Sequence, residues 1–268
     1  MKQLTWIRAI RLFRGATRRA TGIAFLCMIA AYSYAQQTET AEEHYNLGVR
    51  FYEMGDLNGA IAEYQAALRL NPKYVSAHAN LCNALYAKDD LNGAIAECQA
   101  ALRLNPNLAE AHYRLGAALY DKGDLNGAIV EYRAALRLNP DSAVAHHNLG
   151  AALRKKGDIS GAIAEYETAL RINPKYVPAL NNLAWLYATT SDATLRNLPK
   201  ALEYALQAVA LEDGKNPHPL DTLAEAYYVN GDSQRAVLTE KRALALPLDD
   251  ATRKSLQASL ERYEQAPR

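Results

Sequence analysis

Alanine and leucine dominate the apolar positions of this chain, and no stretch alternates apolar and polar residues with the period of two that marks a half-buried strand. Valine, isoleucine and threonine, which favour strands, rarely follow one another in runs. Half of the 268 residues are apolar and 22% are charged, which is enough for a substantial core and too apolar for a disordered chain. The pattern predicts an all-α protein.

One helical pattern recurs in the chain with a period of 34 residues and without insertion or deletion. Its four copies are DLNGAIAEYQAALRLNP at 56–72, DLNGAIAECQAALRLNP at 90–106, DLNGAIVEYRAALRLNP at 124–140 and DISGAIAEYETALRINP at 158–174. Each copy ends in a proline, which cannot continue the preceding helix. A glycine precedes the opening aspartate at Gly55, Gly123 and Gly157, where a left-handed turn joins two helices, whereas the second copy has Asp89 there. Such a fixed period predicts a solenoid of helix pairs.

The residues within these units closely resemble the tetratricopeptide-repeat (TPR) family. When each closing proline is taken as repeat position 32, leucine fills position 7, a small residue fills position 8, and tyrosine or cysteine fills position 24. Positions 7, 8 and 24 are Leu47, Gly48 and Tyr64; Leu81, Cys82 and Cys98; Leu115, Gly116 and Tyr132; and Leu149, Gly150 and Tyr166. Small residues let the two helices of a repeat approach, while leucine and tyrosine fill the gaps between repeats. The resemblance implies an all-α, right-handed TPR superhelical solenoid.

Two less regular units and a capping helix follow the four regular repeats. The fifth unit has an inter-helix turn lengthened by about five residues through SDATLRNLPK, in which Pro199 suits the first turn of the second helix. The tail from Asp249 to Glu264 is amphipathic, as expected of a cap with a polar back. We therefore expect an array of about six repeats at 41–248, divided into 41–74, 75–108, 109–142, 143–176, 177–216 and 217–248. A capping helix and tail at 249–268 complete the chain.

Residues 1–35 have the pattern of a targeting segment in front of the repeats. ATGIAFLCMIAAYSYA at 20–35 is an apolar stretch after a basic lead, and Ser33 and Ala35 place a signal-peptidase site before Gln36. The stretch is shorter than the roughly 20 apolar residues that span a bilayer. A cleaved signal peptide is the first interpretation; the alternatives are an uncleaved inner-membrane anchor, an organellar transit peptide and an extension upstream of the true start. Export predicts a periplasmic or otherwise extracytoplasmic body, joined to this segment by a linker at 36–40.

The charge is divided unevenly along the chain. Six basic residues precede the first acid, Glu39, so that the net charge of +1 falls to −5 without them. A mildly acidic body does not suit the phosphate backbone of a nucleic acid. The sequence also contains no GxGxxG, Walker, GxSxG or HExxH motif. We expect no enzyme activity, no cofactor, no metal, no small-molecule substrate and no nucleic acid, and membrane contact only through residues 1–35.

Histidine replaces the usual tryptophan of the TPR pattern at position 4, in His44, His78, His112 and His146. Equivalent residues of neighbouring repeats lie on the order of 10 Å apart, whereas a shared zinc needs each nitrogen within roughly 2.1 Å. We therefore interpret these histidines as half-buried packing residues. Cys82 and Cys98, the cysteines of the body, lie in the same repeat. Outside the cytoplasm they are a candidate disulfide, with two small core residues as the alternative.

The TPR resemblance also implies where a partner binds, because in this family the first helices of the repeats line a concave groove. The residues at position 6 are Asn46, Asn80, Arg114, Asn148 and Asn182. They resemble the asparagine ladder of the TPR superhelix of O-GlcNAc transferase, in which amides hold a peptide main chain. The alternative is that asparagine recurs at this position only because the repeats are close duplicates of one another. Further groove residues are of the types that dominate interfaces, namely Tyr45, Tyr52, Tyr86, Tyr113, Tyr120, Arg154 and Trp185.

These patterns predict a non-catalytic scaffold that binds an extended peptide or a partner subunit in the concave groove. The alternative, of a different class, is a structural assembly factor that packs laterally into a membrane-bound envelope or secretion complex. The carboxylate clamp of chaperone-binding TPR domains fits poorly, because Tyr45, Val49 and Glu110 occupy positions that require Lys, Asn and Lys. Binding through the groove favours the scaffold, whereas an interface on the convex face or the cap favours the assembly factor.

Overall fold

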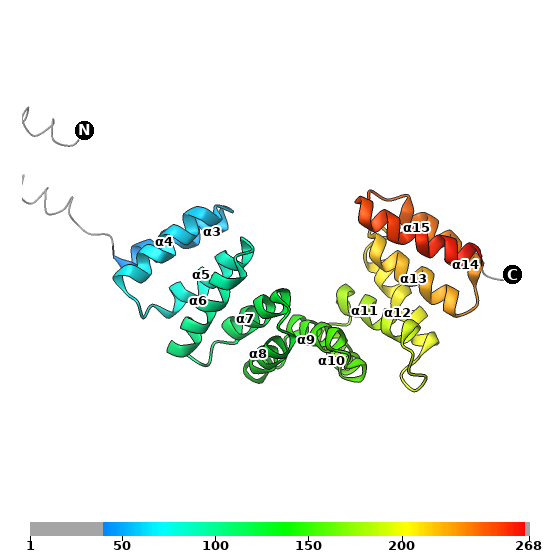
Figure 1. Ribbon diagram of the computed structural model, residues 1–268, viewed down its shortest axis with the longest axis horizontal. Coiled ribbons are helices and arrows are strands. Elements are labelled where there is room, and N and C mark those ends of the chain that lie inside the picture. Colours follow the sequence, from blue (N-terminus) through cyan, green and yellow to red (C-terminus); the bar gives the residue numbers. More distant parts are fainter. Residues whose placement is uncertain (1–39, 266–268) are drawn as a thin grey trace, which may run out of the picture.

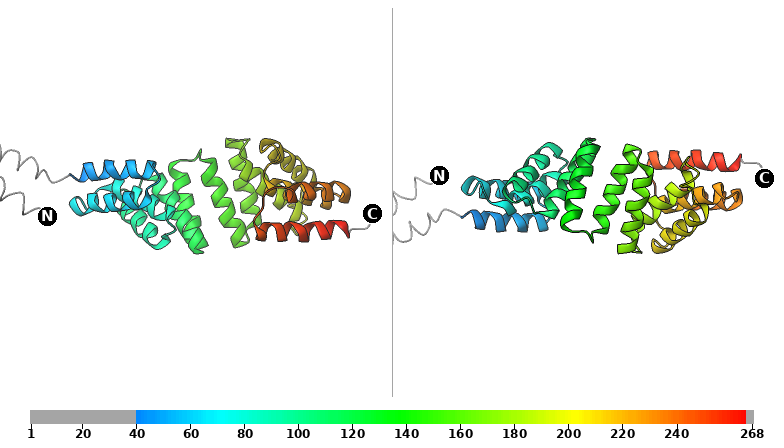
Figure 2. Two further views of the ribbon diagram at one scale, coloured as in Figure 1. Left: turned by 90° about the horizontal axis from the view of Figure 1, so that it is seen from above. Right: turned by 90° about the horizontal axis from the view of Figure 1, so that it is seen from below.

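The computed structural model describes residues 40–265, which form helices joined by short turns and contain no strand. The thirteen helices of this range are α3 (Ala41–Glu53), α4 (Leu57–Leu70), α5 (Val75–Ala87), α6 (Leu91–Leu104), α7 (Ala109–Lys122), α8 (Leu125–Leu138), α9 (Ala143–Lys156), α10 (Ile159–Ile172), α11 (Val177–Thr189), α12 (Leu198–Leu211), α13 (Pro217–Val229), α14 (Ser233–Leu244) and α15 (Asp250–Glu264). Helix pairs stack into an arch, with α5, α7, α9 and α11 along its inner side (Figure 1). Seen from above and below, the arch is elongated, with α3 and α15 toward opposite ends (Figure 2).

Aspartate side chains begin the second helix of every regular repeat. In each, an Oδ1 atom accepts a hydrogen bond of 2.9 Å from the backbone amide of a glycine three residues on, which caps the helix. These N-caps are Asp56, Asp90, Asp124 and Asp158. The turn before the cap needs a left-handed residue: Gly157 has φ of 92°, and Asp89 adopts φ of 63° at the same point of its repeat. Aspartate enters this region more readily than most residues, so the second repeat keeps the turn without glycine.

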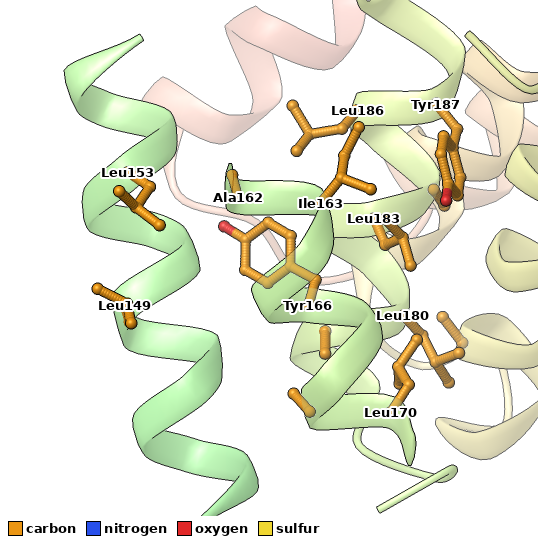
Figure 3. Close-up of a cluster of buried hydrophobic side chains, with 14 of the residues drawn as sticks. Leu149, Leu153, Ala162, Ile163, Tyr166, Leu170, Leu180, Leu183, Leu186 and Tyr187 are labelled. Carbon is orange, nitrogen blue, oxygen red and sulfur yellow. The ribbon is translucent and has the colours of Figure 1, made fainter. Parts of the chain in front are cut away.

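A glycine that faces a tyrosine ring joins the two helices in three of the four regular repeats. A Cβ atom on Gly150 would lie 2.8 Å from the ring of Tyr166, and one on Gly48 would lie 2.7 Å from the ring of Tyr64. Figure 3 shows the ring of Tyr166 reaching from α10 toward Leu149 and Leu153 of α9. Tyr166 is fully buried and belongs to a cluster that continues into α11. The ring therefore fills the gap within its own repeat and contributes to the contact with the next one.

The second repeat replaces this glycine–tyrosine contact by a disulfide. Cys82 of α5 and Cys98 of α6 occupy the glycine and tyrosine positions, and the structure bonds their sulfur atoms with the two Cα atoms 5.3 Å apart. Both cysteines are fully buried and pack with Ala94 and Leu115. A covalent bond therefore ties α5 to α6 where a ring packs between the helices in the other regular repeats.

The C-terminal part departs from the regular pattern at a turn and at the cap. α11 ends at Thr189 and α12 begins at Leu198, so the turn between them is longer than in the regular repeats. Asn197 caps α12 with its side chain, and Pro199 lies in the first turn. The capping helix α15 buries Leu256 and Tyr263, which pack against α13 and α14. The cap thus covers the apolar face that the sixth repeat leaves open.

The predicted targeting segment, residues 1–35, lies outside the described residues, as does most of the predicted linker. The described chain begins at Thr40, whose side chain caps α3. Within residues 40–265, every helix is too short or too polar to cross a membrane.

Candidate functional site

Side chains of α5, α7 and α9, together with Tyr132 of α8, line an open hollow of about 280 Å³. Five of the predicted groove residues line it, namely Tyr86, Tyr113, Arg114, Tyr120 and Asn148. Ala117 and Ala151 also line the hollow, and their small side chains leave space that a larger residue would fill. The structure therefore brings together residues that lie in three successive repeats.

Contacts between these first helices join residues that are 35 positions apart. The hydroxyl of Tyr86 donates a hydrogen bond to Oδ2 of Asp121 at 2.6 Å, and Nζ of Lys155 lies 4.7 Å from the ring centroid of Tyr120. Both tyrosines are half-buried. Burial first, and the hydrogen bond to Asp121 second, raise the pKa of Tyr86 to about 12, so its hydroxyl stays neutral at physiological pH. The rings are held before a partner arrives, which lowers the entropy cost of binding.

The position-6 asparagines form hydrogen bonds to the preceding repeat. Nδ2 of Asn80 donates to the hydroxyl of Tyr45 at 3.2 Å, and Nδ2 of Asn148 donates to the hydroxyl of Tyr113 at 3.0 Å. At the next junction, Nδ2 of Asn182 lies 2.9 Å from Nε2 of His147. Each amide therefore ties one first helix to the next, whether or not it also contacts a peptide. A carboxamide has a second N–H and two acceptor lone pairs, so one such bond leaves capacity for a ligand.

His147 takes the place of tyrosine in this series and is held as a neutral ring. Its Nε2 faces the amide donor of Asn182, while its Nδ1 lies 3.1 Å from Oδ1 of Asn148. The tautomer protonated at Nδ1 satisfies both contacts, and a doubly protonated ring does not. The ring also packs against Tyr166 and Tyr176, with centroids 5.5 Å apart in both cases. Burial is the main cause that lowers the pKa of His147 below 6.5.

The remaining predicted residues are spread over other parts of the array. Asn46 and Arg154 are exposed, and Tyr52 is 38% exposed on α3. Tyr45 packs against Tyr64 and Tyr74, as well as accepting the bond from Asn80. Nε of Arg114 forms an ion pair of 2.7 Å with Glu110 on its own helix. The structure places Trp185 in a second hollow, between α11, α13 and α15.

The position-4 histidines are more than packing residues. In every regular repeat, Nδ1 lies 2.6 Å from a glutamate of the second helix, in the pairs His44–Glu63, His78–Glu97, His112–Glu131 and His146–Glu165. In three repeats Nε2 also contacts the carbonyl oxygen of the closing proline of the preceding repeat, at 3.0–3.1 Å. Sequence reasoning missed this link, although histidine and glutamate recur together 19 residues apart, and that shared period was the available signal.

A buried acidic cluster lies beneath the cap. Glu240 of α14 is fully buried, and neither carboxylate oxygen has a hydrogen-bond donor within the described residues. Burial first, and then the neighbouring Asp221, raise the pKa of Glu240 to about 8. Glu225 is 4% exposed and pairs with Arg262 and with the hydroxyl of Tyr263, both from α15. The cap is therefore attached to the sixth repeat through a carboxylate that would otherwise be buried without a partner.

The described residues contain no group of three or more histidine, cysteine, aspartate or glutamate side chains that could hold a metal ion. The position-4 histidines meet one glutamate each, in separate repeats, and the cysteines of this region are joined to each other. The inner side of the arch presents aromatic rings, amides and charged side chains in fixed positions. Residues of these types suit the binding of a partner.

Comparison with known proteins places the chain among repeat proteins. The model of the TPR repeat matches residues 48–89, 82–123, 116–157 and 152–190. A crystal structure of MamA is 28% identical, covers 63% of this chain and 96% of its own length, and superposes with a TM-score of 0.57. A search of curated proteins gives no match.

Two more distant solved structures share the fold over more of the chain. PilW, described as a widely conserved type IV pilus biogenesis factor, is 19% identical, covers 81% of this chain and 98% of its own, and has a TM-score of 0.69. A tetratricopeptide repeat protein from Parabacteroides merdae is 19% identical, covers 84% and 86%, and has a TM-score of 0.68. TPR repeats generally form non-enzymatic scaffolds that bind other proteins. With its matched repeats spanning more than half of its length, the chain belongs to the TPR repeat family.

Proposed function

We propose that this protein is a non-catalytic scaffold that holds an extended peptide, or an extended segment of a partner subunit, in the groove along α5, α7 and α9. The observation that carries the proposal is the hollow in which Tyr86, Tyr113, Arg114, Tyr120 and Asn148 meet. Tyrosine and arginine contribute strongly to interfaces, and these rings are already held by contacts within the protein. A bound chain therefore meets an ordered surface with large rings and few mobile side chains.

The position-6 asparagines extend this surface along the arch. Asn80, Asn148 and Asn182 each use one amide hydrogen on the preceding repeat, and Oδ1 of Asn148 also faces Nδ1 of His147, so they are held in one orientation. Their remaining hydrogen-bonding groups suit peptide units, which both donate and accept. We propose that they contact main chain, and that the tyrosines of the hollow select side chains.

We also propose that the scaffold works outside the cytoplasm. The apolar stretch and the small residues before Gln36 support export, and the Cys82–Cys98 disulfide suits an oxidising compartment. Start-site sequencing of the protein from envelope fractions tests this directly: cleavage gives a chain beginning at Gln36. An intact chain in the membrane supports the anchor instead, and a reduced cytoplasmic protein contradicts export.

The groove is tested by filling the hollow without removing any of the bonds described above. Ala151→Arg places a long side chain in the hollow, whereas Ala62→Arg places the same side chain on the exposed surface of α4. Partner proteins are captured from the producing cells on the wild-type chain and on both variants, and each variant's thermal melt is recorded. Loss of a partner from Ala151→Arg alone, with an unchanged melt, supports the proposal. Equal capture by all three chains contradicts it.

One observation favours the structural assembly factor as a second candidate. The outer helices carry exposed apolar side chains, with Val130 59% exposed, Leu206 43% exposed and Leu238 64% exposed. Single exposed apolar residues are normal on soluble proteins, but lateral packing into a complex would cover these three. In that case, polar substitution at Leu238 reduces partner capture, while Ala151→Arg does not.

A further inference from the structure

The hollow that contains Trp185 has a chemistry that the groove of the regular repeats lacks. It measures about 470 Å³ and lies between α11, α13 and α15. Its charged lining residues are Arg196, Glu225 and Arg262. Arg196 belongs to the lengthened turn and Arg262 to the capping helix, so no regular repeat can supply either side chain.

Both arginines are held in place by the protein. The guanidinium of Arg196 donates to the carbonyl oxygen of Thr190 from Nε at 3.1 Å and from Nη2 at 3.0 Å. Arg262 pairs with Glu225, and its guanidinium lies 5.1 Å from the ring centroid of Tyr228 and 5.0 Å from that of Tyr263. A guanidinium has five N–H groups, so each retains donors that face other directions.

Among the side chains that line the hollow, two arginines face one carboxylate. Glu225 offsets Arg262, and its side chain is already occupied by that pair and by the hydroxyl of Tyr263. Within residues 40–265, no carboxylate lies within ion-pair distance of Arg196, which is exposed. In the hollow of α5, α7 and α9, by contrast, Arg114 is paired with Glu110 at 2.7 Å. The Trp185 hollow thus has one positive charge that an anionic ligand can pair with.

Apart from Thr189, the rest of the lining is apolar. Trp185, Ala188, Leu198 and Val229 provide an indole ring and aliphatic groups next to the two guanidinium groups. A ligand that matches this lining has an apolar side chain and a carboxylate close together. Arginine suits a carboxylate because its planar fork can donate two parallel hydrogen bonds.

We propose that the Trp185 hollow is a binding site for a peptide segment in which an aromatic or aliphatic side chain lies next to a carboxylate. The carboxylate pairs with Arg196, and the apolar side chain packs on Trp185. The inference rests on the proposed function, since it takes the partner to be a peptide chain in the same arch. The carboxylate can be the end of a chain or the side chain of aspartate or glutamate, and the experiment separates the two.

The test uses the fluorescence of Trp185. The chain has two tryptophans, so Trp6→Phe in the full chain leaves Trp185 as the only one. The probes are short acetylated glycine–serine peptides that end in phenylalanine: one with a free terminal carboxylate, one amidated, and one amidated with glutamate before the phenylalanine. Both acidic forms should change the emission of Trp185 and bind about tenfold more tightly than the neutral form. Preference for only one acidic form identifies the source of the carboxylate.

A matched pair of arginine variants locates the charge. Arg196→Gln should weaken the binding of the acidic peptides by about tenfold and leave the affinity for the neutral peptide unchanged. Arg171→Gln removes an exposed arginine of α10 that is outside the hollow. It should change neither the binding of the acidic peptides nor that of the neutral peptide. Equal binding of acidic and neutral peptides, equal binding by wild type and Arg196→Gln, or no change at Trp185 with any probe overturns the inference. If the Trp185 hollow fails these tests, a partner that the wild type captures and Ala151→Arg does not would still support binding in the groove. The two proposals can therefore fail separately.

Discussion

The regular repeats, α3–α10, and the C-terminal elements, α11–α15, hold their helices together in different ways. In α3–α10 the same contacts return every 34 residues: an aspartate cap, a histidine–glutamate pair and a buried residue at position 24. In α11–α15 the junctions differ from one another, with a long turn held by Arg196 and a cap attached through buried acids. Repetition fixes the scaffold, and the departures from it create the sites with individual chemistry.

The largest expected effect concerns the position-24 tyrosines of the regular half. Tyr132 is 2% exposed against Gly116, so Tyr132→Ala leaves a cavity and should lower the free energy of unfolding by about 3–5 kcal/mol. Tyr52→Ala, at a residue that is 38% exposed, is the control and should change it by less than about 0.5 kcal/mol. Urea unfolding followed by circular dichroism gives both values. Similar losses for the two variants would contradict the packing described for α7 and α8.

The second repeat tests whether the disulfide substitutes for a ring. Reduction should lower the stability of the oxidised wild type by about 3 kcal/mol, the value expected for a loop of this length. The double variant Cys82→Gly with Cys98→Tyr restores the pair found in the other regular repeats and should be insensitive to reductant. Melting curves with and without reductant compare the two chains. Reductant sensitivity in the double variant, or two free thiols in exported wild type, argues against the substitution.

The buried acid beneath the cap gives the C-terminal elements a pH dependence. The pKa of Glu240 is raised to about 8 in the folded chain, against 4.5 for an ordinary glutamate. The folded state therefore keeps a proton that the unfolded state loses, and stability falls as the pH rises from 4.5 through about 8. Glu240→Gln keeps the shape of the side chain without its charge. At alkaline pH, the free energy of unfolding of this variant should exceed that of the wild type by about 1–3 kcal/mol. At acidic pH, the two chains should melt alike.

The junction between the fourth and fifth repeats should respond to pH in the opposite sense. His147 has a folded pKa below 6.5, so its contribution is complete above 6.5 and is lost as the pH falls toward the folded pKa. His147→Tyr introduces the residue that Tyr113 supplies at the preceding junction, where its hydroxyl accepts from Asn148. On acidification, the variant should lose less of its free energy of unfolding than the wild type, by about 0.5–1.5 kcal/mol. Thermal melts of both chains on either side of pH 6.5 measure it, and identical pH profiles would show that His147 does not titrate.

The backbone of the regular half could be predicted almost completely from the sequence, because its helix ends and turns are properties of the repeat, whereas the histidine–glutamate pairs were missed. The aspartate before each second helix indicates a helix start, and the structure shows it as the N-cap in every regular repeat. The family and the fold followed from these residues alone. Asp89 shows the limit of such rules, since it adopts φ of 63° at the point where the other regular repeats have glycine.

The sites were harder to predict because they depend on side chains that meet across repeats. The sequence indicated Asn80 and Asn148 as free groove amides, but their bonds to Tyr45 and Tyr113 depend on how one repeat is rotated against the next. The acidic cluster has no period at all: Asp221, Glu225 and Glu240 look like ordinary helix-surface residues until the cap covers them. Likewise, Arg196 of the long turn and Trp185 of α11 line one hollow only once the fifth repeat and the cap are folded together.

Photo-cross-linking in the producing cell can show directly whether a partner lies in the groove of the regular repeats. A photoreactive phenylalanine analogue replaces Tyr120 inside the hollow in one chain and Leu238, 64% exposed on α14, in another. We expect a cross-linked partner from position 120 and none from position 238, and we expect the product at 120 to be lost when Ala151→Arg fills the hollow. Cross-links from position 238 alone would contradict the groove and place the partner on the outer side of the arch.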